Sequence, residues 1–319
     1  MNKLLIISGP TATGKTSLAL KLAELFNGEL ISADSRQVYK EMNIGTGKEW
    51  GVKSKKQKAK SKINIWGYDV VSPNEEWSAA HFVRYANKII ADIDKRKKLP
   101  IIVGGTGLYI NNLLQPPKTL FTPQDLSLRL KLEKLNIQQL QNKFRRMNQQ
   151  RFNNMNESDQ KNPRRLIRAI EVVKFTKLHK SNGDFVNFRP DALHIGITAP
   201  TREIDHRIKN RVADRIKQGL EQEVKTLVKK YGWNSILSTT IAYQEWRPYL
   251  KNEITLEKVI ETWTTHEKQY ARRQITWLKK YQPRQWFDIT DTSFLKNIVS
   301  RVRQWYDQAN VDRQIKTSA

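Results

Sequence analysis

The chain has 319 residues and a formal net charge of +26, from 57 lysines and arginines against 31 acidic residues, and it has no cysteine. The absence of cysteine excludes disulfides, thiolate catalysis and cysteine-ligated zinc, and fits a reducing cytoplasm. No apolar run reaches the roughly 20 residues of a membrane helix, and residues 1–7 lack the long apolar region of a signal peptide. The length predicts about two domains or one domain with an insertion, and the charge favours a polyanionic partner such as nucleic acid.

The first 115 residues alternate between short apolar runs and segments with apolar residues at helical spacing. This alternation is typical of an α/β fold with a parallel sheet covered by helices on both faces. A lysine-rich stretch, Lys53–Lys62, has no periodicity, and we interpret it as a solvent-exposed loop. The pattern predicts strands at Lys3–Ser8, Glu29–Ala33, Ile63–Val71 and Leu99–Val103, and helices at Ser17–Phe26 and Trp77–Lys97.

The remaining chain divides into a polar, basic helical part and a return of the strand pattern. We predict that residues 118–188 form a helical insertion domain, and that residues 1–117 and 189–319 together form the α/β core. The last residues, Asn310–Ala319, are expected to fray. The predicted elements after the insertion are a strand at Ala192–Ala199, helices at Ile204–Lys230 and Thr255–Tyr281, a strand at Gln285–Ile289 and a helix at Phe294–Gln308.

Residues 9–16 read GPTATGKT and match the phosphate-binding pattern G-x-x-x-x-G-K-[ST] between a predicted strand and a predicted helix. Backbone N–H groups at the start of such a helix point at an anion, and the helix dipole adds to their field. Lys15 adds a positive charge, and the Thr16 hydroxyl is the expected ligand of Mg²⁺. The pattern predicts diphosphate binding by Gly9, Pro10, Thr11, Ala12, Thr13, Gly14, Lys15 and Thr16.

Two further segments follow predicted strands and should reach the same edge of the sheet, where ligands bind in such folds. Asp34 follows the second strand, and Gly104–Thr106 follows the strand Leu99–Val103. An ordinary phosphate-loop NTPase carries an acidic residue at the end of an apolar strand, where it holds Mg²⁺. In this chain the strand Leu99–Val103 is followed by no such acid. Asp34 is therefore a metal-linked acid, a catalytic base, or simply a helix N-cap, and a kinase remains an alternative to other uses of the loop.

Five sequence blocks occur in an order and at a spacing that resemble the tRNA dimethylallyltransferase family. The resemblance implies a fold like that of phosphate-loop NTPases, and transfer of a dimethylallyl group from dimethylallyl diphosphate to tRNA. The acceptor would be the exocyclic amine of the adenosine on the 3′ side of the anticodon, and pyrophosphate would be released. The blocks are GPTATGKT (9–16), ADSRQVYKEMNIGTGK (33–48), LPIIVGGTGLYI (99–110), NPRRLIRAIEV (162–172) and QYARRQITWLKK (269–280).

The resemblance also implies roles for individual residues. Asp34 would be the general base that takes a proton from the amine, and Thr106 the second contact near that amine. The target base would leave the anticodon loop for a pocket, because enzymes that modify a stacked base extrude it. Trp277 fits the core of the protein equally well. The residues expected to bind tRNA are Asp34, Ser35, Arg36, Gln37, Thr106, Arg129, Arg164, Arg165, Arg168, Tyr243, Gln244, Arg273, Thr276, Trp277 and Lys279.

Two positions depart from the family pattern. Ala242 stands where the family usually has glycine, which would strain the backbone if the position needs a positive φ. Residues 64–69 replace the usual His-His-Leu-Ile-Asp block. The expected partners are the tRNA anticodon stem-loop and dimethylallyl diphosphate, without a membrane, and the expected state is a cytoplasmic monomer. The alternatives are a small-molecule or nucleotide kinase with residues 118–188 as a lid, a transferase acting on free adenine nucleotides, and a non-catalytic RNA-binding protein.

Overall fold

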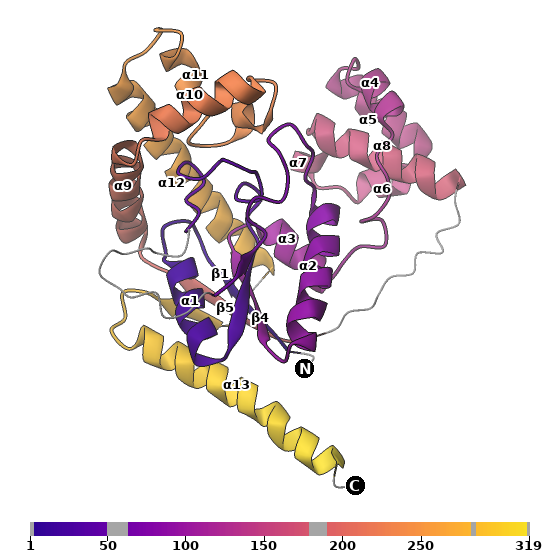
Figure 1. The fold of residues 1–319 in the computed structure, drawn as a ribbon. Coiled ribbons are helices and arrows are strands. Elements are labelled where there is room, and N and C mark those ends of the chain that lie inside the picture. Colours follow the sequence, from indigo (N-terminus) through magenta and orange to yellow (C-terminus); the bar gives the residue numbers. More distant parts are fainter. Residues whose placement is uncertain (1–2, 50–62, 179–189, 282–284, 318–319) are drawn as a thin grey trace. The chain divides into compact units, whose positions relative to one another are not determined.

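A computed structural model shows how the chain folds (Figure 1) and describes residues 3–49, 63–178, 190–281 and 285–317, with side chains up to residue 308. In these residues, six parallel strands form one sheet in the order β3-β2-β4-β1-β5-β6. The predicted stretch Lys53–Lys62 lies outside the described residues. The strands are β1 (Lys3–Ser8), β2 (Gly28–Ser32), β3 (Ile65–Trp66), β4 (Leu99–Gly104), β5 (Asp191–Thr198) and β6 (Gln285–Asp288).

Helices cover both faces of the sheet, so the predicted α/β class is confirmed. Because successive side chains of a strand point to opposite faces, Leu5 and Ile7 of β1 share one apolar cluster with residues of α1 (Lys15–Leu25) and α13 (Phe294–Thr317). Figure 1 shows α2 (Ala79–Lys95) on the other side of the strands from α1.

A second apolar cluster lies beyond the sheet edge where the strands end. It contains Tyr39, Ile208, Tyr243 and Trp263, and it packs four helices and the segment after β2 together. Two long helices that contribute to this cluster, α9 (Thr201–Lys217) and α12 (Leu256–Tyr281), contact each other. The helices α10 (Leu220–Tyr231) and α11 (Trp246–Tyr249) also contribute to the cluster, and a 3₁₀ turn lies at Ile236–Thr239. The helix α3 (Gly107–Leu114) contacts α2 and α12.

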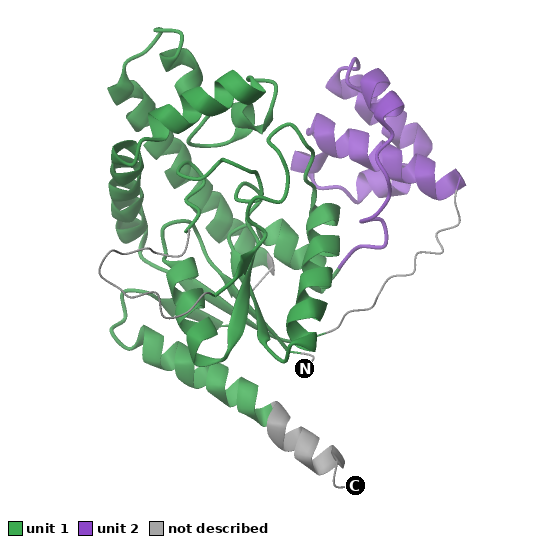
Figure 2. Cartoon of the chain, viewed as in Figure 1, with its two compact units in different colours: residues 1–115, 188–319 green, residues 116–187 purple. Residues whose placement is uncertain are grey.

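The contacts divide the chain into two compact units, coloured in Figure 2: unit 1 contains residues 1–115 and 188–319, and unit 2 contains residues 116–187. Unit 2 has its own apolar core, in which Phe144 and Leu166 are fully buried. No described helix is both long and apolar enough to cross a membrane. The helices of unit 2 are α4 (Leu126–Leu132), α5 (Ile137–Met147), α6 (Gln149–Asn153), α7 (Glu157–Gln160) and α8 (Pro163–Leu178).

Three predicted elements differ from the observed ones. The predicted strand Ile63–Val71 is reduced to β3, because Gly67 and Asp69 have φ angles of 92° and 53°, which a strand cannot contain. The predicted helix Ile204–Lys230 is two helices, separated at Gly219 with a φ of 94°. The last helix does not end near residue 308, and its backbone stays helical to Thr317 where fraying was expected.

Candidate active site

A cavity of about 610 Å³ lies within unit 1, at the edge of the sheet where β1, β2 and β4 end. Its walls come from the glycine-rich loop (residues 9–16), the segment after β2, residues 45–49, α9 and α12. The sequence-predicted residues that line it are Thr11, Ala12, Gly14, Lys15, Thr16, Asp34, Ser35, Arg36, Gln37, Gln244 and Arg273.

The glycine-rich loop has the conformation that its pattern predicts. Gly14 has a φ of 75° and immediately precedes α1, so the first N–H groups of that helix lie beside the cavity. Thr13 is buried and donates its hydroxyl to the carbonyl of Pro10 at 2.8 Å. The Lys15 ammonium donates to the same carbonyl at 2.6 Å. Burial, and next the charge of Arg211, lower the pKa of Lys15 to about 8.

Three arginines on α9, spaced four residues apart, add positive charge to the same wall. This arginine row consists of Arg207, Arg211 and Arg215. Arg211 Nη2 donates to the Thr11 hydroxyl at 2.7 Å and to the buried carboxylate of Glu267 at 3.0 Å. Burial, and next the charge of Arg211, lower the pKa of Arg215 to about 10. Several cations beside helix-terminal amides form an anion site suited to two linked phosphates.

Asp34 also lines the cavity, and hydrogen bonds fix its orientation. Its Oδ1 accepts from the backbone N–H groups of Arg36 at 2.8 Å and Gln37 at 3.3 Å. Thr106 Oγ1 accepts from the N–H of Ser35 at 3.1 Å, and the Thr106 hydroxyl also forms a hydrogen bond with the hydroxyl of Tyr270, a half-buried residue. Burial raises the pKa of Tyr270 above its ordinary value. Asp34 and Thr106 therefore lie together, as predicted, on segments joined by direct hydrogen bonds.

Gln37 and Glu223 fix the loop of residues 43–47, which contributes Gly45, Thr46 and Gly47 to the cavity wall. Gln37 Nε2 donates to the carbonyl of Gly47 at 3.1 Å. Glu223 accepts from the N–H groups of residues 43, 44 and 45, and from the Tyr243 hydroxyl at 2.6 Å. Tyr243 is fully buried, so in this conformation it offers no surface to an RNA and instead supports Glu223.

The departure at position 242 has a visible effect on the backbone. Ala242 is fully buried with a φ of 78°, the left-handed conformation that favours glycine. Its N–H donates to the buried carboxylate of Glu245 at 2.9 Å, which stabilises the turn despite the side chain. The expected strain is therefore present, and the loop conformation that glycine would allow is kept.

The α12 residues predicted from the basic block fall on different faces of that helix. Arg273 lines the cavity, whereas Thr276 and Lys279 are exposed. Trp277 is half-buried and lies against Gly107, where a Cβ would be 1.8 Å from a ring carbon. The prediction left Trp277 between RNA contact and core, and the structure shows it packing two helices together.

Unit 2 carries the other predicted tRNA contacts, and most of them have partners within it. Arg129 donates to the buried carboxylate of Glu171 at 2.6 Å and 2.8 Å. Arg168 donates to the Thr122 carbonyl at 2.7 Å, and Arg165 pairs with Asp159. The remaining arginine of this group, Arg164, is exposed on the first turn of α8. Arg129 and Arg168 therefore stabilise unit 2 through their charges, whatever else they contact.

The sequence reading missed the arginine row and its partner Glu267. The signal was present, because arginines four residues apart share one face of a helix. A basic stripe on a charged helix is usually a solvated face, and only the packing of α9 against α12 turns this one toward the cavity.

Comparisons with known proteins give a consistent result. A family model described as IPP transferase matches residues 37–281. The tRNA dimethylallyltransferase of Leuconostoc mesenteroides is 35% identical over 288 residues, which cover 89% of this chain and 92% of the relative. The tRNA dimethylallyltransferase of Acetivibrio thermocellus is 37% identical over 316 residues, which cover 93% and 96%.

Solved structures extend the similarity to three dimensions. The tRNA isopentenylpyrophosphate transferase of Staphylococcus epidermidis is 34% identical with a TM-score of 0.66, covering 95% of this chain and 99% of that one. A eukaryotic dimethylallyltransferase described as acting on tRNA is 26% identical with a TM-score of 0.77, covering 94% and 77%.

Proposed function

The chain belongs to the IPP transferase family, and we propose that it transfers a dimethylallyl group from dimethylallyl diphosphate to tRNA. The acceptor is the exocyclic amine of the adenosine on the 3′ side of the anticodon, and the other product is pyrophosphate. One observation carries this proposal: a single cavity brings two cations, Lys15 and Arg211, together with the carboxylate of Asp34.

Departure of the diphosphate is the step that the cations assist. The bond between the allylic carbon and the diphosphate oxygen breaks, and negative charge grows on the leaving oxygens. Lys15, Arg211 and the N–H groups at the start of α1 are already in place to stabilise that charge, so little reorganisation is required. Arg211 Nε is buried without a hydrogen-bond partner among the described residues, which fits a group that donates a hydrogen bond to a ligand oxygen.

Asp34 acts on the nucleophile. As the bond between the amine nitrogen and the allylic carbon forms, one proton leaves the nitrogen, and Asp34 accepts it. The two backbone N–H groups on Oδ1 orient the carboxylate, and the described hydrogen bonds leave Oδ2 to face the amine. Thr106 lies beside Asp34 and would contact the same amine, held there by Ser35 and Tyr270.

Thr16 fits the role of a Mg²⁺ ligand. Its side chain lines the cavity at the start of α1, and Mg²⁺ is usually held by one or two protein oxygens together with substrate phosphates and water. No group of three or more acidic, histidine or cysteine side chains suited to a metal is found in the part of the chain that the structure describes. When bound to the diphosphate, the ion supplies positive charge to the leaving oxygens.

The geometry favours carbon–oxygen cleavage over the kinase alternative. β4 ends at Gly104 and is followed by Gly105 and Thr106, which offer no carboxylate for a metal or an attacking group at phosphorus. The basic surface also favours tRNA over a free nucleotide as acceptor, since a small acceptor needs no net charge of +26. We further propose that the enzyme acts as a cytoplasmic monomer.

The test is a transfer assay with labelled dimethylallyl diphosphate, Mg²⁺ and unmodified tRNA. We expect label to enter tRNA, and Asp34→Ala to lower the rate by roughly 10²–10⁴ at saturating tRNA. Asp92→Ala, an exposed acid on α2, is the control and should not change the rate. A second tube holds labelled ATP with small acceptors. ATP consumption without label in tRNA would overturn the proposal in favour of a kinase.

A further inference from the structure

Gln274 lies on α12, the helix whose residues Glu267, Tyr270 and Arg273 line the cavity, and it has no role in the mechanism proposed above. It is a buried residue of α12, with 6% of its surface exposed. Its Oε1 accepts from the backbone N–H of Thr11 at 2.8 Å, and its Nε2 donates to the carbonyl of Gly105 at 3.1 Å. One side-chain amide therefore connects the glycine-rich loop to the segment after β4.

The two ends of this connection belong to the two halves of the reaction. Thr11 is part of the loop that holds the leaving diphosphate, and its hydroxyl oxygen accepts a hydrogen bond from Arg211. Gly105 precedes Thr106, whose N–H donates to the carbonyl of Ala33 at 3.1 Å, directly before Asp34. A short path of hydrogen bonds therefore runs from the diphosphate side through Gln274 to the base.

Neighbouring residues on the same face of α12 have related contacts. Glu267 holds Arg211, and Tyr270 bonds Thr106. Positions 267, 270 and 274 follow the three- and four-residue spacing of one helix face. Gln274 is the member of this face that reaches both the diphosphate loop and the acceptor side through its own atoms.

We propose that Gln274 is a positioning residue that sets the separation between the glycine-rich loop and the Asp34–Thr106 side of the cavity. This inference rests on the proposed prenyl transfer. Its bonds go to backbone groups, so it acts on the substrates through the loop and through Thr106. A misplacement of about 1 Å between reacting groups can cost roughly 10²-fold in rate. Loss of Gln274 should therefore lower kcat far more than it raises KM for dimethylallyl diphosphate.

Two variants separate hydrogen bonding from packing. Gln274→Met keeps the length of the side chain and removes both hydrogen bonds. Gln274→Glu keeps an acceptor for the Thr11 N–H but places a second acceptor against the Gly105 carbonyl. For both variants we expect kcat per folded enzyme to fall at least about tenfold, with KM for dimethylallyl diphosphate within about threefold of the parent. Gln222→Met, an exposed glutamine of α10, is the matched control and should behave as the parent does.

Steady-state kinetics on tRNA, with folded enzyme quantified by thermal unfolding, decide the outcome. If Gln274→Met does not fold, Gln274→Glu carries the test, since it has the shape of the parent residue. A kcat within twofold of the parent for a folded variant, or a loss found in KM alone, would overturn the inference. If the parent enzyme itself transfers no label to tRNA, the proposed function fails instead, so the two failures are distinguishable.

Discussion

At the scale of single residues, the fold lowers the pKa of Lys15. Burial, and then Arg211, lower its pKa to about 8. Below that pH the ammonium is charged and binds the diphosphate, and above it the neutral amine does not. We therefore expect the contribution of Lys15 to pyrophosphate affinity to decline between pH 7 and pH 9, approaching about tenfold per pH unit above the pKa.

The measurement is calorimetric titration with inorganic pyrophosphate at constant ionic strength, for the parent and for Lys15→Met. Pyrophosphate itself titrates in this range, so the informative quantity is the ratio of the two affinities at each pH. We expect the ratio to be largest at pH 7 and to decrease through pH 8. A ratio that stays constant to pH 9 would show that Lys15 keeps its proton throughout.

Residues with a fixed place in a motif could be predicted, and residues defined by packing could not. Lys15 and Thr16 line the cavity because the local strand–loop–helix connection by itself determines where these two residues lie. Arg211 has no such local constraint, since its direction depends on α9 packing against α12, which are joined by a long stretch of chain. Tyr243 shows the converse, because a residue expected at the RNA surface is instead buried against Glu223.

At the scale of helices, the contact between α3 and α12 depends on Gly107. The Trp277 ring occupies the space of a Cβ at that position, 1.8 Å from one ring carbon, so Gly107→Ala must displace the ring or separate the two helices. We expect a loss of about 1–3 kcal/mol of unfolding free energy, as for other overpacked sites. Turnover should also fall, because Thr106 directly precedes Gly107 in the chain. Thermal unfolding and tRNA prenylation measure the two effects.

The neighbouring residue provides the control for this prediction. Leu108 lies on the same helix with 53% of its surface exposed, so Leu108→Ala should change stability by less than about 0.5 kcal/mol. If Gly107→Ala is as stable as Leu108→Ala, then Trp277 has room to move and the packing described here is wrong.

The type and order of most helices and strands followed from apolar periodicity, while their ends did not. Periodicity continues across Gly219, so the sequence predicted one helix where a φ of 94° makes two. Likewise, the apolar run Ile63–Val71 has strand composition, but the positive φ of Gly67 turns the chain out of the sheet after β3. A single backbone angle set by tertiary packing leaves little trace in a composition pattern.

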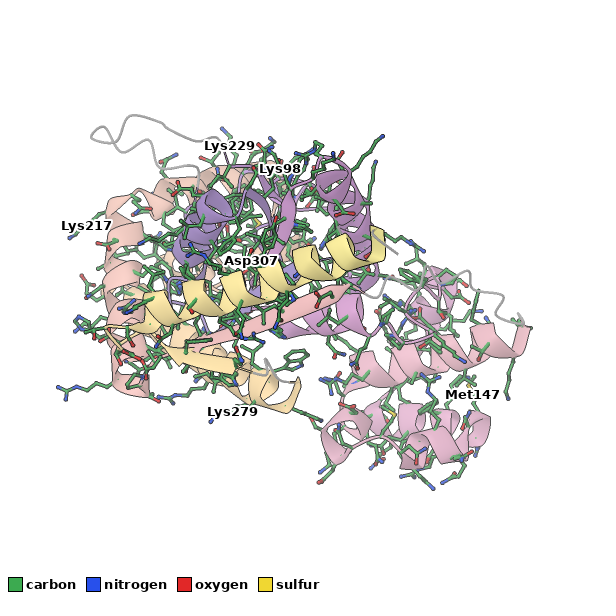
Figure 3. All side chains as sticks on the ribbon, turned by 90° about the horizontal axis from the view of Figure 1, so that it is seen from below. Lys98, Met147, Lys217, Lys229, Lys279 and Asp307 are labelled. Atoms are coloured by element: carbon green, nitrogen blue, oxygen red, sulfur yellow. The ribbon has the colours of Figure 1, made fainter. Side chains whose placement is uncertain are left out.

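At the scale of the whole molecule, ion pairs neutralise the acidic side chains that the fold buries. Among the described residues, four glutamates are buried, and each of them binds a cation or a histidine within its unit: Glu29, Glu171, Glu245 and Glu267. Figure 3 shows Lys217, Lys229 and Lys279 at the periphery of unit 1, and these lysines are exposed. These ion pairs remove equal positive and negative charge, so the net charge of +26 remains to attract an RNA.

This net charge predicts a steep salt dependence of tRNA binding. A protein that neutralises 6–10 phosphates loses roughly 10³–10⁵ in affinity between 50 and 200 mM salt, because counterions are released on binding. We expect filter binding with unmodified tRNA to show a loss of affinity in that range. Lys279→Ala should reduce the slope of log affinity against log salt concentration by about one if this lysine contacts a phosphate. Binding that does not change with salt would mean that the surface charge is not used for tRNA.

The burial of the four glutamates has a consequence for how such a protein diverges. Replacement of Glu171 removes the carboxylate that Arg129 binds, and replacement of Glu267 removes the carboxylate that Arg211 and the buried Arg215 bind. A broken buried pair typically costs about 3–5 kcal/mol, a large part of the stability of a typical chain. Replacement of an exposed lysine changes stability little and changes RNA affinity directly. Selection can therefore adjust the strength of RNA binding over generations through surface lysines while these interior glutamates stay constant.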